Sequence, residues 1–114
     1  MHEVSIMQSV FEIAIGRLES SGYGRIDSIA LRIGGAAGVV TDSLRFAFEA
    51  LKPGTPLEGA ALLIEEVPVG GRCLSCGKDF STQQRYIFEC PACGENDLEV
   101  TRGRELDLIG MEVS

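Results

Sequence analysis

The chain has 114 residues, of which 45% are hydrophobic, and a formal net charge of −7 at neutral pH. This length is typical of one domain, or of one domain and a small satellite, and no apolar run is long enough to span a membrane. The acidic balance argues against nucleic acid as a partner, because phosphates are repelled unless basic residues cluster on one surface.

The first predicted element is a helix from Glu3 to about Ser20. Apolar residues recur there at spacings of three and four, which places them on one helical face that we expect to be core. They are Val4, Met7, Val10, Phe11, Ala14, Ile15 and Leu18. The segment 20–24 combines two serines with two glycines, which is typical of a helix end followed by a turn.

A strand, a second helix and a second strand follow in the next forty or so residues. Residues 25–33 alternate between polar and apolar and predict a strand that buries Ile29, Leu31 and Ile33. Thr41 or Asp42 is a suitable N-cap for a helix that ends near Leu51. Its expected inner face consists of Val40, Leu44, Ala47, Phe48 and Leu51. Residues 61–67 predict a second strand, which Pro68 and the two glycines that follow Val69 are expected to end.

Residues 103–113 predict a third strand, on the far side of a cysteine-containing segment. The expected fold class is therefore α/β (α+β), with two helices, a small mixed three-stranded sheet and an inserted zinc-ribbon module. The first two strands are expected to form a right-handed parallel crossover through the second helix, with the third strand beside them. This arrangement predicts one domain from 1–69 and 103–114, and a zinc-binding domain from 70–102.

The cysteine-containing segment predicts a structural zinc site. Its four cysteines form two C-x₂-C pairs separated by thirteen residues: Cys73, Cys76, Cys90 and Cys93. Two thiolates three positions apart on a tight turn supply two corners of a tetrahedron, and a second such turn supplies the other two. A glycine follows each pair, and glycine permits the positive φ with which the chain can curl behind the metal.

Two other uses of cysteine fit this segment less well. A redox couple needs one C-x₂-C at the start of a helix, whereas here there are two pairs and neither precedes helical periodicity. A secreted disulfide scaffold is disfavoured because the N-terminus lacks a basic region and an apolar run before a cleavage site. Reduced thiols and this N-terminus predict a cytoplasmic protein.

The N-terminus offers a second metal site. The single histidine is His2, and its imidazole, its backbone nitrogen and the amine of Met1 can close two fused chelate rings in one plane. Such tetragonal nitrogen coordination suits nickel(II) or copper(II) rather than zinc. Glu3 adds a carboxylate nearby, either as a further ligand or as an anion that the helix dipole stabilises.

The sequence resembles the nickel metallochaperones of hydrogenase maturation, the HypA/HybF family. The resemblance covers nearly the whole chain. It starts with the first three residues and includes the two cysteine pairs and the segments 31–34, 46–49, 54–60, 64–68 and 103–106. One departure is the loop 35–38, Gly-Ala-Ala-Gly, where many members carry a bulkier residue and a serine. The departure bears on partner contacts and leaves the metal sites unchanged.

The resemblance implies a nickel carrier rather than an enzyme. It implies Ni(II) bound at the N-terminus by Met1, His2 and, as a further ligand, Glu3, and a structural Zn(II) held by the four cysteines. The implied partners are a nickel-handling GTPase of the hydrogenase maturation pathway and the [NiFe]-hydrogenase large subunit, with no nucleic acid and no membrane. Some relatives also serve urease.

Two other functions remain open from the residues alone. The first is a zinc-ribbon adaptor that binds protein or nucleic-acid partners and has no role for His2. The second is an enzyme, but the sequence shows no acid–base pair, nucleophile constellation or cofactor fingerprint, and four sulfur ligands leave zinc no open position for catalysis. The prediction is therefore a non-catalytic nickel delivery protein.

Overall fold

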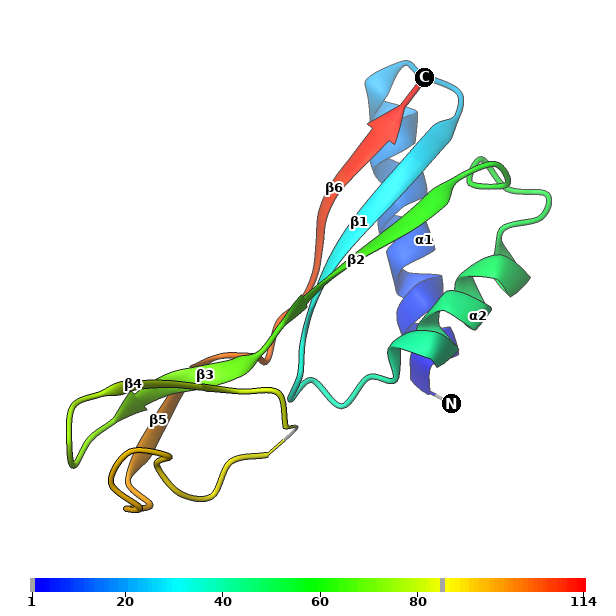
Figure 1. Cartoon of the computed structure of the whole chain (residues 1–114). Helices are drawn as coiled ribbons and strands as arrows, with labels where there is room; N and C mark the ends of the chain where they lie inside the picture. Colours follow the sequence, from blue (N-terminus) through cyan, green and yellow to red (C-terminus); the bar gives the residue numbers. More distant parts are fainter. Residues whose placement is uncertain (1, 85) are drawn as a thin grey trace. The chain divides into compact units, whose positions relative to one another are not determined.

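The computed structural model describes residues 2–84 and 86–114, and over these residues it contains two helices and two three-stranded sheets (Figure 1). The helices are α1 (His2–Ser21) and α2 (Thr41–Leu51). The strands, in chain order, are β1 (Ile26–Gly34), β2 (Ala61–Val67), β3 (Val69–Cys73), β4 (Asp79–Thr82), β5 (Leu98–Arg102) and β6 (Leu106–Val113). No helix in this described part of the chain is long and apolar enough to cross a membrane.

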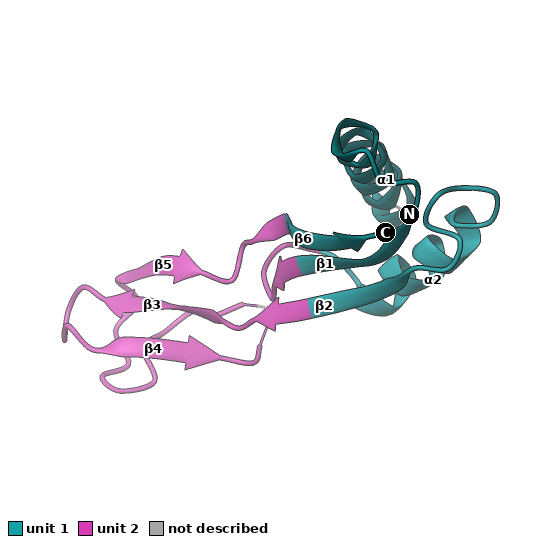
Figure 2. Cartoon of the chain, turned by 90° about the horizontal axis from the view of Figure 1, so that it is seen from above, with its two compact units in different colours: residues 1–31, 39–64, 108–114 teal, residues 32–38, 65–107 magenta. Residues whose placement is uncertain are grey.

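The chain forms two compact units (Figure 2). Unit 1 comprises residues 1–31, 39–64 and 108–114, and unit 2 comprises residues 32–38 and 65–107. The boundary between the units crosses β1, β2 and β6, whereas the sequence predicts a zinc-binding domain confined to 70–102. That residues 70–102 form a separate zinc-binding domain therefore stays a prediction.

The first sheet has the strand order β2-β1-β6. Strands β1 and β2 are parallel: at one end the N–H of Ile26 donates to the Pro56 carbonyl at 3.0 Å, and at the other the N–H of Gly35 donates to the Val67 carbonyl at 2.9 Å. Strand β6 runs in the opposite direction, as the arrows in Figure 2 show. The predicted mixed three-stranded sheet with two helices is confirmed.

The core of unit 1 lies where the helices meet this sheet. The rings of Phe11 on α1 and Phe48 on α2 pack edge to face with centroids 5.7 Å apart. Most of the predicted buried residues are confirmed: Met7, Val10, Phe11, Ala14, Leu18, Leu44, Ala47, Phe48, Ile29 and Leu31 in unit 1, and Ile33 in the part of β1 that belongs to unit 2. Ile15 and Leu51 are only half-buried. The prediction was wrong for Val4 and Val40, which are 42% and 52% exposed. Val4 lies in the first turn of α1, and Val40 is the N-cap residue that precedes α2.

The start of helix α2 also differs from the prediction. Neither Thr41 nor Asp42 is the N-cap. Val40 occupies that position, and its apolar side chain cannot accept a hydrogen bond from the helix. The N–H of Val40 instead donates to the carboxylate of Glu3, on helix α1, at 3.2 Å. Glu3 thus accepts from the N–H of the N-cap residue, as the N3 carboxylate of a capping box would, while the first turn of α2 has no side-chain cap of its own.

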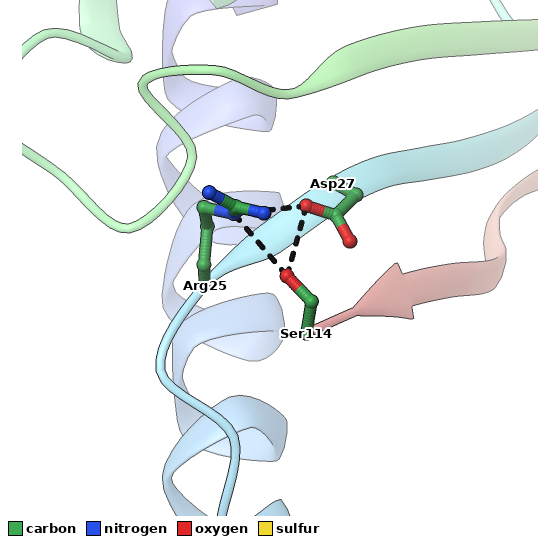
Figure 3. A network of polar contacts seen from close by, with 3 residues as sticks. All are labelled: Arg25, Asp27 and Ser114. Carbon is green, nitrogen blue, oxygen red and sulfur yellow. Dashed lines mark hydrogen bonds and ion pairs between the residues drawn. The ribbon is translucent and has the colours of Figure 1, made fainter.

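The end of β6 is tied to the start of β1 by a small polar network (Figure 3). Arg25 Nε donates to Asp27 Oδ1 at 3.1 Å and to Ser114 Oγ at 3.2 Å, and the Ser114 hydroxyl donates to Asp27 Oδ1 at 3.2 Å. The Ser114 carbonyl also accepts from the N–H groups of Gly24 and Arg25 at 3.1 Å each. This network links the C-terminal end of β6 to the start of β1.

Strand β2 ends at Val67, as predicted, but the glycines that follow Val69 lie in a further strand that the sequence did not predict, in a second sheet with the order β4-β3-β5. Val69–Cys73 is instead the central strand, paired antiparallel with both neighbours. Glycine occurs there because the backbones approach closely: a Cβ on Gly71 would overlap the Glu99 carbonyl. Glycine inside a strand marks such an approach as often as it marks a break.

Gly34, at the end of β1, is expected to tolerate no side chain. A Cβ there would overlap the backbone carbonyl of Gly103, so Gly34→Ala should lower the free energy of unfolding by about 1–3 kcal/mol. Gly110 in β6 has no atom within 4 Å of an added Cβ, and Gly110→Ala should change it by less than about 0.5 kcal/mol. Urea unfolding of both variants in the presence of zinc measures the difference. Equal stability of the two variants would contradict the close approach.

Candidate metal centres

The four cysteines lie in two turns of unit 2. Cys73 is the last residue of β3 and Cys76 lies in the turn before β4, while Cys90 and Cys93 lie in the turn before β5. All four Sγ atoms are within 4.8 Å of one another. Cys73 Sγ is 3.6 Å from Cys93 Sγ, and Cys76 Sγ is 3.8 Å from Cys90 Sγ. Four sulfurs around zinc at about 2.3 Å are separated by about 3.8 Å, so the arrangement fits a tetrahedral zinc ion.

The two turns have the same geometry. Gly77 and Gly94 have φ of 76° and 78°, and their N–H groups donate to the carbonyls of Cys73 and Cys90 at 2.9 Å each. The N–H of Cys76 donates to Cys73 Sγ at 3.5 Å, and the equivalent turn directs the N–H of Ala92 to Cys90 Sγ at 3.4 Å. The predicted positive φ at both glycines is thereby confirmed.

The surroundings of the sulfurs shift two of the thiols in opposite directions. A backbone hydrogen bond from Glu95 lowers the pKa of Cys93, but burial and hydrogen bonds with the other sulfurs outweigh it and raise that pKa to about 12. Hydrogen bonds from the backbone N–H groups of Cys93 and Ala92 lower the pKa of Cys90 to about 7. Cys73 and Cys90, one from each turn, are buried, whereas Cys76 and Cys93 are exposed. All four thiols are free. Four protein sulfurs would complete a tetrahedron, so a zinc ion held by them would have no open position.

The second candidate centre is at the start of helix α1. Met1 lies outside the described residues, so its amine is not placed. The His2 side chain is 59% exposed, and its Nε2 is 3.7 Å from Glu3 Oε2. As the first residue of α1, His2 has a backbone N–H that needs no partner within the helix, because the first four N–H groups of a helix have none. A metal bound at this nitrogen therefore breaks no helical hydrogen bond.

Glu3 differs from His2 in being buried. Its side chain is 6% exposed, and the same Oε2 that faces His2 accepts the hydrogen bond from the N–H of Val40. Hydrogen bonds to the carboxylate lower the pKa of Glu3 to about 2, so the group is ionised at any physiological pH. The sequence alone does not reveal this contact, since it joins residues 37 positions apart.

A family model described as "Hydrogenase/urease nickel incorporation, metallochaperone, hypA" matches residues 1–113. The chain belongs to the HypA family. Its relatives include proteins named hydrogenase maturation factor HypA. That of Geobacter metallireducens is 47% identical over 113 residues, with 99% of each chain covered. That of Chloroflexus aurantiacus is 43% identical over 112 residues, with 98% of each covered.

Solved structures of HypA proteins have the same fold as this HypA-family chain. The solution structure of the Ni metallochaperone HypA from Helicobacter pylori matches with a TM-score of 0.67, covering 99% of this chain and 97% of that one. A second, entitled "Solution structure of HypA protein", matches with a TM-score of 0.71 and covers 100% and 97%. Both are 22% identical in sequence. The expected membership of the HypA family and the expected fold are thus confirmed.

Proposed function

We propose that this chain carries nickel(II) as cargo during maturation of [NiFe]-hydrogenase. The observation that carries the proposal is the match of a nickel-incorporation family model from residue 1 onwards, which includes His2. The proposed ligands are the amine of Met1, the backbone nitrogen of His2 and the His2 imidazole. Together they make the planar nitrogen set that nickel favours and zinc does not.

The exposure of the two centres fits two different uses of metal. His2 is open to solvent, so a bound ion there can be passed to a partner. We propose that the four cysteines hold zinc(II) permanently. The distances between their sulfur atoms suit zinc, and four sulfur ligands leave the ion no position for a substrate. Zinc would stabilise the fold of unit 2 and take no part in catalysis.

The role of Glu3 follows from its hydrogen bond to Val40. We propose that it positions the N-terminus by linking the starts of the two helices, and that any ligation of nickel by its carboxylate competes with that bond. Glu3→Gln should therefore weaken nickel binding less than His2→Ala does.

The proposed partners are a nickel-handling GTPase of the maturation pathway and the [NiFe]-hydrogenase large subunit. The proposed compartment is the cytoplasm, where four free thiols stay reduced. Delivery to urease is the alternative destination, consistent with the wording of the matched family model.

Hydrogenase activity in cells tests this function. Cells without their own copy of the protein would express the wild type, His2→Ala or, as the matched control, Gln8→Ala at an exposed position of α1. His2→Ala should lower [NiFe]-hydrogenase activity at least about tenfold, since loss of a metal ligand should exceed the effect of outer-shell changes. Excess nickel in the medium should restore part of the activity by mass action.

Full activity with His2→Ala would contradict nickel carriage through this residue. It would favour a zinc-ribbon adaptor that works through protein contacts alone. Equal losses with His2→Ala and Gln8→Ala would also count against the proposal, because they would show a general effect of changing the helix surface.

A further inference from the structure

An arginine on one edge of the second sheet reaches across the central strand to the other edge. Arg102 is the last residue of β5, and its guanidinium contacts β4, although β3 lies between the two strands. One terminal nitrogen donates to Asp79 Oδ1 at 3.2 Å and the other to Asp79 Oδ2 at 2.8 Å. The second nitrogen also donates to the Phe80 carbonyl at 2.7 Å. The contact is a two-pronged ion pair with a third hydrogen bond, which fixes the geometry of both partners.

The central strand leaves room for this contact at Gly70. Gly70 lies directly opposite Arg102 in the β3–β5 pairing. A Cβ on Gly70 would lie 2.5 Å from the Nε and Cζ atoms of Arg102. Any other residue at position 70 would displace the guanidinium, so glycine here permits an edge-to-edge contact across the sheet.

Arg102 contacts the segment that directly follows the first cysteine turn. The N–H of Cys73 donates to the Lys78 carbonyl at 2.9 Å, which closes the turn that contains Cys73 and Cys76. Asp79 is the next residue and the first of β4. Phe80 follows, and its side chain is 4% exposed. Arg102 therefore fixes both ends of a two-residue segment that begins immediately after the turn.

The contact favours the charged form of both side chains. Hydrogen bonds from Arg102 hold the pKa of Asp79 below its ordinary value, and the same bonds raise the pKa of Arg102. Another arginine pair in unit 2 provides a contrast. Arg32 donates from Nε and a terminal nitrogen to a single oxygen, Oε2 of Glu65, at 3.2 and 3.1 Å. That pair joins β1 to β2 and contacts no residue of either cysteine turn.

We propose that Arg102 is a positioning residue of the four-cysteine centre. By clamping Asp79 and Phe80 it keeps Cys73 and Cys76 in the geometry in which they hold zinc, and so slows the loss of the metal. The inference rests on the proposed zinc site. It adds a residue that touches no sulfur and lies nine positions beyond the last cysteine.

Transfer of zinc to a chromogenic chelator tests this inference. Elemental analysis of each purified protein comes first: one zinc per chain is expected, and none in the wild type would overturn the zinc site itself, separately from the clamp. Arg102→Lys keeps the charge but loses the two-pronged contact, and Asp79→Asn keeps the shape but loses the charge. Each should speed zinc transfer about three- to tenfold, below the effect of residues that contact metal ligands directly.

The double variant and a matched control separate positioning from general damage. Arg102→Lys with Asp79→Asn should be no faster than the faster single variant, because both remove one interaction. Arg32→Lys should stay within about twofold of the wild type. Cobalt(II)-loaded variants should keep the thiolate-to-cobalt absorption band, which shows that all four sulfurs still bind. Two results would overturn the proposal. In the first, Arg102→Lys and Asp79→Asn transfer zinc no faster than Arg32→Lys. In the second, the fold-increases in transfer rate of the two single variants multiply in the double variant.

Discussion

Single Cys73→Ala or Cys90→Ala substitutions are expected to unfold strands β3, β4 and β5 and to leave helices α1 and α2 folded. The second sheet buries few large apolar side chains, chiefly Val69 and Phe80 beside the two buried cysteines. Binding of a structural zinc ion contributes on the order of 10 kcal/mol or more, and most of the stability of such a small sheet should come from it.

The helices should survive because unit 1 has an apolar core of its own. Hydrogen exchange followed by mass spectrometry measures the two units separately: amide protection in residues 69–102 should fall to that of an open chain, while residues 6–18 keep theirs. Ser75→Ala, at an exposed position between Cys73 and Cys76, is the matched control and should change neither. Loss of protection in α1 together with the sheet would contradict two separately stabilised units.

The sequence predicted most of this fold because most of its elements carry a strong periodic pattern. Both helices, β1 and β2 were predicted to within about two residues of their ends, from apolar spacing and from glycine or proline at the boundaries, whereas β6 begins three residues later than predicted. The cluster of four cysteines could be predicted for a similar reason, since the identity and spacing of these residues are local properties of the chain.

Strands β3, β4 and β5 could not be predicted in the same way. Strand β3 begins at Val69, directly after Pro68, and its next two residues are glycines. This combination normally indicates a turn. Its glycines are required by close approach to Glu99 and to Arg102, and both of these residues are about thirty positions away. The strand that requires each glycine is therefore distant in the sequence, and the local sequence pattern carries no information about it.

Two polar contacts were missed for a related reason. Glu3 and Val40 meet across two helices, and Arg102 and Asp79 meet across a sheet. Neither pair has a spacing that helix or strand periodicity links. Glu3 was singled out by its place in the first turn of α1, but its partner became evident only from the structure.

An N-terminal extension is expected to abolish nickel binding at His2 and to leave zinc bound. An added residue converts the Met1 amine to an amide, so the amine, backbone nitrogen and imidazole no longer close the same two rings. Only the imidazole remains unchanged, and with a four-residue extension the affinity for nickel should fall at least about 100-fold, equivalent to about 2.8 kcal/mol. One added residue is a poor test, because an amine, two amides and an imidazole at position three also chelate nickel in a plane. Four added residues without histidine avoid this second chelate.

Acid should release nickel from the native protein. Protons compete with nickel for the imidazole and for the amine, so binding should weaken as the pH falls from about 8 towards 6.

The most direct measurement is the number of nickel ions bound per chain, by native mass spectrometry at pH 8, for the protein that begins at Met1 and for the form with four residues added before it. The proposed function predicts one zinc in both proteins and one nickel in the native form alone. Equal nickel binding by the two forms would contradict an N-terminal nickel site and would point to the thiolates of the four cysteines instead.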